Sequence, residues 1–142
     1  MKKFTKILLP VDGSKTSRTA KEHAIALATA MEAEIVLVYI TGLIPAIITG
    51  KPREEAINAQ KEEADTVLKP YRNYLNDHRI TYNEVISSAF HPGDEICKIA
   101  NNEGCDLIVM GSRGLSDIEG LFLGSVTHRV LSRCDIPVMV VR

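Results

Sequence analysis

The sequence predicts an α/β fold, in which residues 1–142 form one domain with a parallel sheet and helices on both faces. Two observations carry this prediction. Short apolar segments alternate with segments of helical periodicity along the chain, and four of the apolar segments consist almost entirely of Val, Ile, Leu and Met. Strands of a parallel sheet are covered on both faces, so they read as continuous apolar runs.

Five segments are expected to be strands. The buried ones are Ile7–Val11, Ile35–Ile40, Leu107–Met110 and Val138–Val141, and the less apolar Thr81–Ser88 is expected at an edge. Alternation with helices implies right-handed crossovers between parallel strands. Ligands of such sheets bind outside the carboxyl ends of the strands, where the strand order reverses. This rule points to the ends of the first and fourth strands.

Helical periodicity fills the intervals between the strands. The expected helix boundaries are Ser14 or Ser17 before the first helix, Pro52 at the start of the second, Gly104 after the third and Ser125 at the start of the fourth. Pro70 lies inside the second helix and is predicted to kink or split it. The apolar segment Gly42–Gly50 is too short for a core helix, and its pattern fits a lid, a partner contact or a buried loop equally.

Charge and hydropathy exclude several classes of partner. Seventeen basic residues face eighteen acidic ones, so the net charge of -1 gives no footprint for nucleic acid or an anionic membrane. No apolar segment has the length of a membrane span. The basic start is followed only by Ile7–Val11, which is too short for a signal-peptide core. A cytoplasmic location is therefore expected.

The three cysteines, Cys97, Cys105 and Cys134, are odd in number and widely spaced. None has the spacing of a metal site, and Cys97 and Cys134 fall among apolar residues of predicted helices. We therefore expect all three to be unpaired cysteines that pack as small hydrophobic residues. No metal-ligating residues are predicted.

The loop between the fourth strand and the fourth helix carries the clearest functional signal. Gly111 and Gly114 follow the strand directly, and Gly124 and Ser125 precede the helix. Glycines allow the backbone to approach a ligand, and backbone amides at a helix N-terminus favour phosphate. The plainer alternative is a turn followed by a helix cap. Because both amide-rich ends belong to one loop, the pattern favours phosphate binding.

This pattern, Gly-x2-Gly-x9-Gly-Ser after Asp106–Met110, resembles the nucleotide-binding signature of the ATP-binding branch of the universal stress protein family. Ile7–Ser14 is similar to the family's first strand and acidic turn, and Ile136–Val141 to its last strand. The resemblance implies the strand order 3-2-1-4-5 and a nucleotide at the ends of strands one and four. It also implies a homodimer through the last strand, which would lie at a sheet edge.

The resemblance also implies a role for each site residue. Asp12 would contact the ribose, flanked by Pro10 and Val11; Ile40 would offer backbone groups to adenine; Met110 would wall the pocket; and Gly111, Gly114, Gly124 and Ser125 would hold the phosphates. Mg²⁺ could accompany the phosphates with mostly water ligands. From the residue pattern alone, Asp12 could equally shape the Asp-Gly turn or cap the next helix.

Three functions fit these observations. The first is an ATP-binding sensor or regulatory module of the stress response, the second a slow ATPase, and the third a dimeric interaction protein without nucleotide. Intact glycines disfavour the third, and no catalytic residue is predicted because no general base is evident near the phosphates. Gly-x-Gly-x-x-Gly after the first strand and the P-loop signature are both absent, which excludes Rossmann dehydrogenases and P-loop NTPases.

Overall fold

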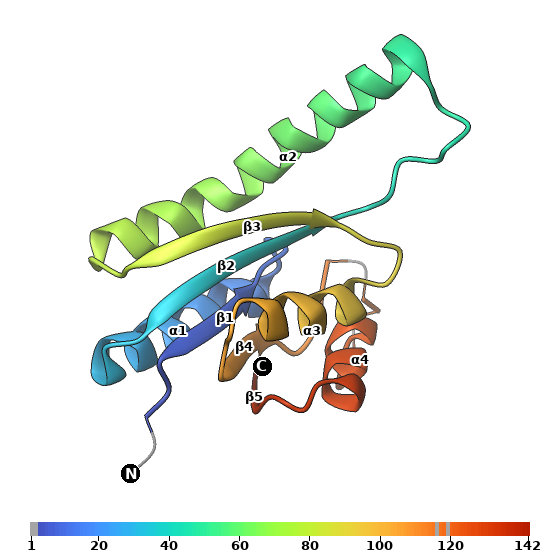
Figure 1. The fold of residues 1–142 in the computed structure, drawn as a ribbon. Coiled ribbons are helices and arrows are strands. Elements are labelled where there is room, and N and C mark those ends of the chain that lie inside the picture. The colour runs from blue at the N-terminus through green and yellow to red at the C-terminus, as the bar shows by residue number, and fades with distance from the viewer. Residues whose placement is uncertain (1–2, 116, 119) are drawn as a thin grey trace.

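The computed structural model describes residues 3–115, 117–118 and 120–142. Its five parallel strands are in the order β3-β2-β1-β4-β5 (Figure 1). The predicted fold class and strand order are therefore confirmed. In chain order the elements are β1 (Lys6–Pro10), α1 (Lys15–Met31), β2 (Glu34–Thr41), α2 (Gly50–Asp77), β3 (Tyr82–Ser88), α3 (Pro92–Asn102), β4 (Leu107–Gly111), α4 (Ser125–Arg133) and β5 (Val138–Val141).

Each face of the sheet has its own apolar core. Neighbouring residues of β1 alternate between them, with Leu9 in the cluster that includes α1 and α2 and Leu8 in the cluster that includes α3 and α4. Both side chains are 0% exposed. Because successive strand residues point to opposite faces, one apolar strand contributes to both cores. This explains the continuous apolar runs in the sequence.

The first residues of α1 and α4 determine how the loops at the carboxyl ends of β1 and β4 are held. Ser14 is the N-cap of α1, and its hydroxyl accepts a hydrogen bond from the Ser17 amide at 3.3 Å. Gly124 is the N-cap residue of α4, without a side chain to bond the first turn. The first-turn amides of an α-helix have no intrahelical acceptor. Those of α4 therefore depend on other partners.

Of the two effects predicted for Pro70, a kink or a split, the split is wrong, because α2 is one helix from Gly50 to Asp77. A proline removes the amide that would bond the carbonyl four residues earlier. Pro70 is exposed, so solvent can reach this side of the helix and satisfy the freed carbonyl of Thr66. The helix also has buried residues on both sides of Pro70, including Leu68 and Tyr71, which hold it against the sheet.

The apolar segment before α2 is not a buried loop. Ile47 is 89% exposed, and the segment extends with the start of α2 beyond the sheet (Figure 1). Its backbone is held from α2, since Gln60 donates to the Gly42 carbonyl at 2.8 Å and Arg53 donates to the Ile48 carbonyl at 3.2 Å. A lid and a partner contact both remain compatible with this position.

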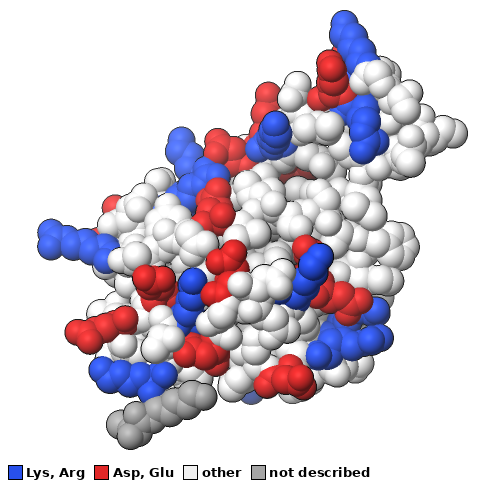
Figure 2. Space-filling model, in the orientation of Figure 1, with Lys and Arg blue, Asp and Glu red and all other residues white. Residues whose placement is uncertain are grey.

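Acidic and basic side chains are interspersed on the face drawn in Figure 2, as the balanced charge of the sequence suggests. No helix among the described residues is long and apolar enough to cross a membrane.

Candidate functional site

A cavity of about 160 Å³ lies at the carboxyl ends of β1, β2 and β4. This is the switch point of the sheet, since β1 has β2 on one side and β4 on the other. The residues that line it are Pro10, Val11, Asp12, Ser17, Val38, Ile40, Pro92, Ile96, Met110, Gly111, Arg113, Gly114, Val126 and Thr127. All of the predicted site residues except Gly124 and Ser125 are therefore brought together here.

Gly124 and Ser125 line an adjoining, more open cavity of about 690 Å³ beside the start of α3 and along α4. The two cavities share Pro92 and Val126 as lining residues. A ligand that filled the first cavity and extended past Val126 would therefore reach the start of α4. The predicted site is therefore divided between two adjoining cavities, of which the one that contains Gly124 and Ser125 is the more open.

The turn after β1 is held in a fixed shape. Gly13 has a φ of 83°, a conformation that favours glycine. Asp12 Oδ1 accepts a hydrogen bond from the Ser14 amide at 2.9 Å, and the Gly13 amide donates to the Tyr71 hydroxyl at 3.2 Å. Burial raises the pKa of Tyr71, so its hydroxyl stays neutral. Asp12 thus shapes the turn through one oxygen.

The other oxygen of Asp12 lies next to Gly114, and both residues line the cavity. A Cβ atom built on Gly114 would lie 2.9 Å from Asp12 Oδ2. The two roles weighed for Asp12 are therefore compatible, because Oδ1 organises the turn while Oδ2 lies next to Gly114. Any larger residue at position 114 would crowd this carboxylate.

The base of the glycine loop is tied to the start of α1. The Thr16 hydroxyl donates to the Arg113 carbonyl at 2.7 Å, and the Ser14 hydroxyl reaches the same carbonyl at 3.3 Å. A Cβ atom on Gly111 would lie 2.8 Å from the Ser17 backbone nitrogen. Gly111 is therefore required by the packing of β4 against α1, besides lining the cavity.

Gly124 closes the loop by returning to its beginning. Its amide donates to the Ser112 carbonyl at 2.7 Å, and a Cβ atom here would lie 3.2 Å from the Arg113 Cα. Gly124 itself therefore offers no free amide, because this amide is already used to close the loop. The amides with no intrahelical acceptor follow it, at Ser125, Val126 and Thr127. The Thr127 hydroxyl donates to the Gly111 carbonyl at 2.8 Å, which fixes α4 against β4.

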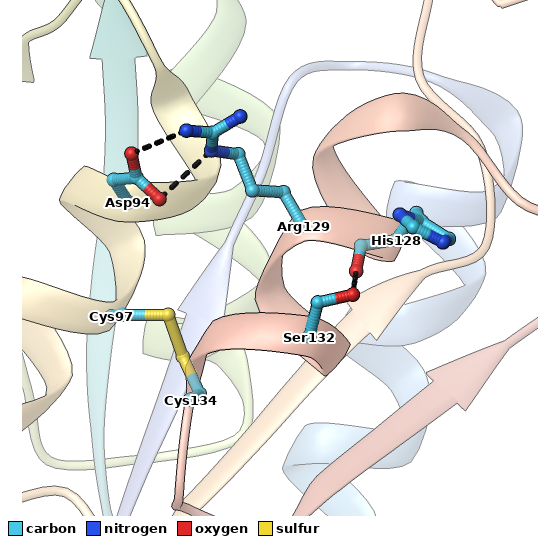
Figure 3. The surroundings of a disulfide bond; sticks show 6 residues. All are labelled: Asp94, Cys97, His128, Arg129, Ser132 and Cys134. Atoms are coloured by element: carbon cyan, nitrogen blue, oxygen red, sulfur yellow. Dashed lines mark hydrogen bonds and ion pairs between the residues drawn. A yellow bond between two sulfur atoms is a disulfide. The ribbon is translucent and has the colours of Figure 1, made fainter.

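The expectation that all cysteines are unpaired is wrong for two of them. Cys97 of α3 and Cys134, the C-cap of α4, form a disulfide with their Cα atoms 5.5 Å apart (Figure 3). They are separated by 37 residues, so sequence spacing gave no signal of the pairing. Cys105 is free and buried, as expected, and burial raises the pKa of its thiol to about 11.

An ion pair joins the same two helices closer to the cavities. Arg129 donates to both carboxylate oxygens of Asp94, at 2.8 and 3.0 Å (Figure 3). This hydrogen bonding lowers the pKa of Asp94 below its ordinary value. Gly93 allows the close approach, because a Cβ atom there would lie 2.8 Å from the Arg129 Cβ. Helices α3 and α4, which line both cavities, are therefore connected by a disulfide and by an ion pair.

Several lining residues were missed by the sequence argument. Pro92 and Ile96 come from α3, and Val126 and Thr127 from α4. Their positions depend on how these helices pack, which the residue pattern does not specify. Among residues 3–115, 117–118 and 120–142, no group of three or more His, Cys, Asp or Glu side chains is arranged to hold a metal ion.

A parallel α/β fold with a cavity at its switch point defines a class of proteins that bind ligands beyond the ends of their strands. Within this class the chain belongs to the universal stress protein family, whose model matches residues 3–142. It is 34% identical to universal stress protein MJ0531 of Methanocaldococcus jannaschii over 144 residues, which cover 98% of this chain and 82% of that protein.

Solved structures have the same fold. The structure of MJ0577, another universal stress protein of M. jannaschii, has a TM-score of 0.86 and 33% identity, covering 96% of this chain and 94% of that chain. A universal stress family protein from Arabidopsis thaliana, solved with AMP bound, has a TM-score of 0.71 and 19% identity. The similarity covers 96% of this chain and 90% of the plant chain and, at this identity, shows the fold alone.

Proposed function

We propose that this chain binds ATP at the switch point and acts as a sensor or regulatory module of the stress response. The observation that carries the proposal is that Asp12, Gly114 and the first turn of α4 line one cavity, beside a loop that the bond from the Gly124 amide to the Ser112 carbonyl closes. Carboxylates accept hydrogen bonds from ribose hydroxyls, and helix N-termini favour phosphates. AMP bound to the Arabidopsis relative supports an adenine nucleotide as the ligand class.

Each part of ATP has a proposed place. Adenine lies against the backbone of Val38 and Ile40, and the ribose hydroxyls bond Asp12 Oδ2. The phosphates follow Gly114, Gly124 and Ser125, which we call the phosphate cradle, toward the more open cavity. Mg²⁺ fits as a companion of the phosphates with mostly water ligands, since the described residues form no metal site of their own.

Replacing Gly124 with Val tests this proposal. The new side chain would overlap the Asp117 carboxylate and crowd the Arg113 backbone, so it would close the cradle. We expect ATP affinity to fall by tenfold or more, about 1.4 kcal/mol, while adenosine affinity is retained. Isothermal titration calorimetry measures both. Gly42→Val is the matched control, because a Cβ atom at Gly42 meets nothing within 4 Å. Equal ATP affinity in the two variants would remove the cradle from the account.

Binding is proposed to outweigh turnover. The loop offers donors for phosphate charge, and hydrolysis also needs a base that positions water. We therefore expect phosphate release far below about 10 per second, the turnover of a typical enzyme. A phosphate-release assay on pure protein decides this point. A rate near that value would make the chain an ATPase.

A homodimer through β5 is the second part of the proposal. β5 lies at the end of the strand order and leaves one side open to a partner. The carbonyls of Pro137 and Val141 accept bonds from β4, so alternation turns the backbone of Val138 and Val140 outward. An antiparallel partner strand would bond these outward groups across a two-fold axis.

The outward orientation of Val140 selects the variant that tests the dimer. Val140→Pro removes an outward amide while leaving the bonds to β4, a position where proline is tolerated. Val140→Ala is the control, because it shortens the side chain and keeps the amide. Sedimentation is expected to give twice the chain mass for wild type and Val140→Ala, and a monomer for Val140→Pro. A dimer in all three would place the interface elsewhere.

We also propose a cytoplasmic location, which is the expectation drawn from the sequence. The disulfide makes this proposal testable, since disulfides are rare in a reducing cytoplasm unless they respond to redox state. Thiol labelling of Cys97 and Cys134 in rapidly quenched cells gives the oxidised fraction. A reduced or mixed pair is expected, whereas complete oxidation would favour an oxidising compartment.

A further inference from the structure

The phosphate cradle already contains an anionic side chain. Asp117, in the loop between β4 and α4, accepts a hydrogen bond from the Gly114 amide through Oδ2. A Cβ atom built on Gly124 would overlap this oxygen and lie 2.9 Å from Asp117 Cγ. The carboxylate therefore lies between the two glycines, where the proposed phosphates would approach the backbone.

We propose that Asp117 is an internal occupant of the phosphate cradle and sets selectivity among adenine nucleotides by the number of phosphates they carry. The inference rests on the proposed function, because it concerns the same site. A carboxylate and a phosphate both accept hydrogen bonds from backbone amides, and both are anions. They compete for the Gly114 donor, and they repel each other at close range.

A second carboxylate makes this competition sharper. Asp12 Oδ2 is 2.9 Å and Asp117 Oδ2 is 3.4 Å from the position that a Cβ atom on Gly114 would take. Gly114 is thus flanked by negative charge on two sides. Asp12 is fixed by its bond to the Ser14 amide, whereas the described contacts of the Asp117 side chain are with the loop itself. The phosphate chain therefore displaces Asp117 rather than Asp12.

The displaced side chain has a favourable place to go. A shallow hollow beside the cradle is lined by Asp117 together with Ser14, Lys15, Thr16, Arg113 and Gly114. Lys15 and Arg113 are cationic, so the carboxylate can turn toward positive charge when it leaves the Gly114 amide. Moving Asp117 away from the Gly114 amide costs free energy, and this cost weakens the binding of any nucleotide whose phosphates enter the cradle. Adenosine lacks phosphates and does not incur it.

Asp117→Asn tests the inference, because asparagine keeps an oxygen acceptor for the Gly114 amide and removes the charge. We expect ATP affinity to rise by about tenfold, because a neutral asparagine binds the Gly114 amide less strongly than the charged aspartate does and is easier for phosphate to displace. Adenosine affinity is expected to stay unchanged. Asp135→Asn is the matched control, an exposed position outside the cavities with the same change in net charge. Calorimetry with ATP and adenosine measures all three proteins.

A measurement without nucleotide tests the contact separately. Amide hydrogen exchange at Gly114, followed by NMR, is expected to be at least about tenfold faster in Asp117→Ala than in wild type, because the acceptor is lost. Unchanged exchange would overturn the inference, as would equal ATP affinity in wild type and Asp117→Asn. Absence of binding by both ATP and adenosine in every protein would instead overturn the proposed function, and the inference with it.

Discussion

The two faces of the sheet are stabilised by different means. The face under α1 and α2 has the larger apolar cluster, with large buried side chains such as Leu68 and Tyr71. The face under α3 and α4 has a smaller cluster, supplemented by the disulfide and by the ion pair between Asp94 and Arg129. Because Arg72 of α2 also pairs with Glu84 of β3, each face has an ion pair, and the disulfide is the tie that distinguishes the face of the helices that line both cavities.

The largest expected effect compares the two cores through adjacent residues of β1. Leu9→Ala on the α1 and α2 face and Leu8→Ala on the α3 and α4 face each remove a side chain that is 0% exposed. We expect each variant to lower the free energy of unfolding by about 2–5 kcal/mol, from lost burial and the cavity left behind. Urea denaturation measures the loss.

This pair of variants tests whether covalent ties replace packing. Suppose that Leu8→Ala lowers the free energy of unfolding by much less than the range for buried leucines, while Leu9→Ala stays within that range. The disulfide then substitutes for the apolar core on the face under α3 and α4. Similar losses on both faces, which we expect, mean that packing governs each face and that the disulfide adds to it.

The disulfide gives the next largest effect. A crosslink between residues 37 apart restricts the unfolded chain, and its removal is expected to cost about 3–4 kcal/mol. Thermal unfolding of wild type with and without a dithiol reductant measures this difference. The double variant Cys97→Ser, Cys134→Ser is the control, because it has no bond to reduce and its stability should not respond to reductant. A wild type that is equally indifferent would show that the crosslink does not stabilise the fold.

The same comparison shows how much the sequence could predict. The apolar runs and the helical periodicity specified the strands, because burial on both faces leaves a direct signal in each segment. The disulfide left no such signal. Cys97 and Cys134 occupy apolar positions of separate helices, and only the packing of α3 beside α4 brings their Cα atoms within 5.5 Å.

The site divides in a similar way. The residues at the carboxyl ends of β1 and β4, such as Asp12 and Met110, were predicted to meet because strand topology fixes their positions, and they line one cavity. Lining residues from α3, such as Pro92, were missed because helix packing places them. Gly111 was assigned to phosphates, but its close contact with the start of α1 gives it a packing role that spacing alone could not distinguish.

The smallest expected effect comes from the ion pair between Asp94 and Arg129. This pair lies on the face under α3 and α4, which we call the crosslinked face because it carries the disulfide. Arg129 holds the pKa of Asp94 below its ordinary value, so the folded state favours the charged carboxylate. The stabilisation is therefore complete above the unfolded pKa of about 3.9 and is lost as pH falls through the lower folded pKa. At neutral pH Asp94→Asn is expected to be slightly less stable than wild type, because exposed ion pairs contribute little. The gap should narrow as the pH falls below about 4, and added salt should reduce it at neutral pH.

Urea denaturation across this pH interval, with Asp135→Asn as the exposed control, separates the ion pair from the general effect of losing one negative charge. Asp94 bonds Arg129 across the gap between α3 and α4, whereas Asp135 lies exposed before β5. A gap that narrows on acidification for Asp94→Asn but not for Asp135→Asn assigns the effect to this pair. Parallel pH profiles for wild type and Asp94→Asn would mean that the ion pair adds nothing to the crosslinked face, which would then depend on its apolar core and its disulfide alone.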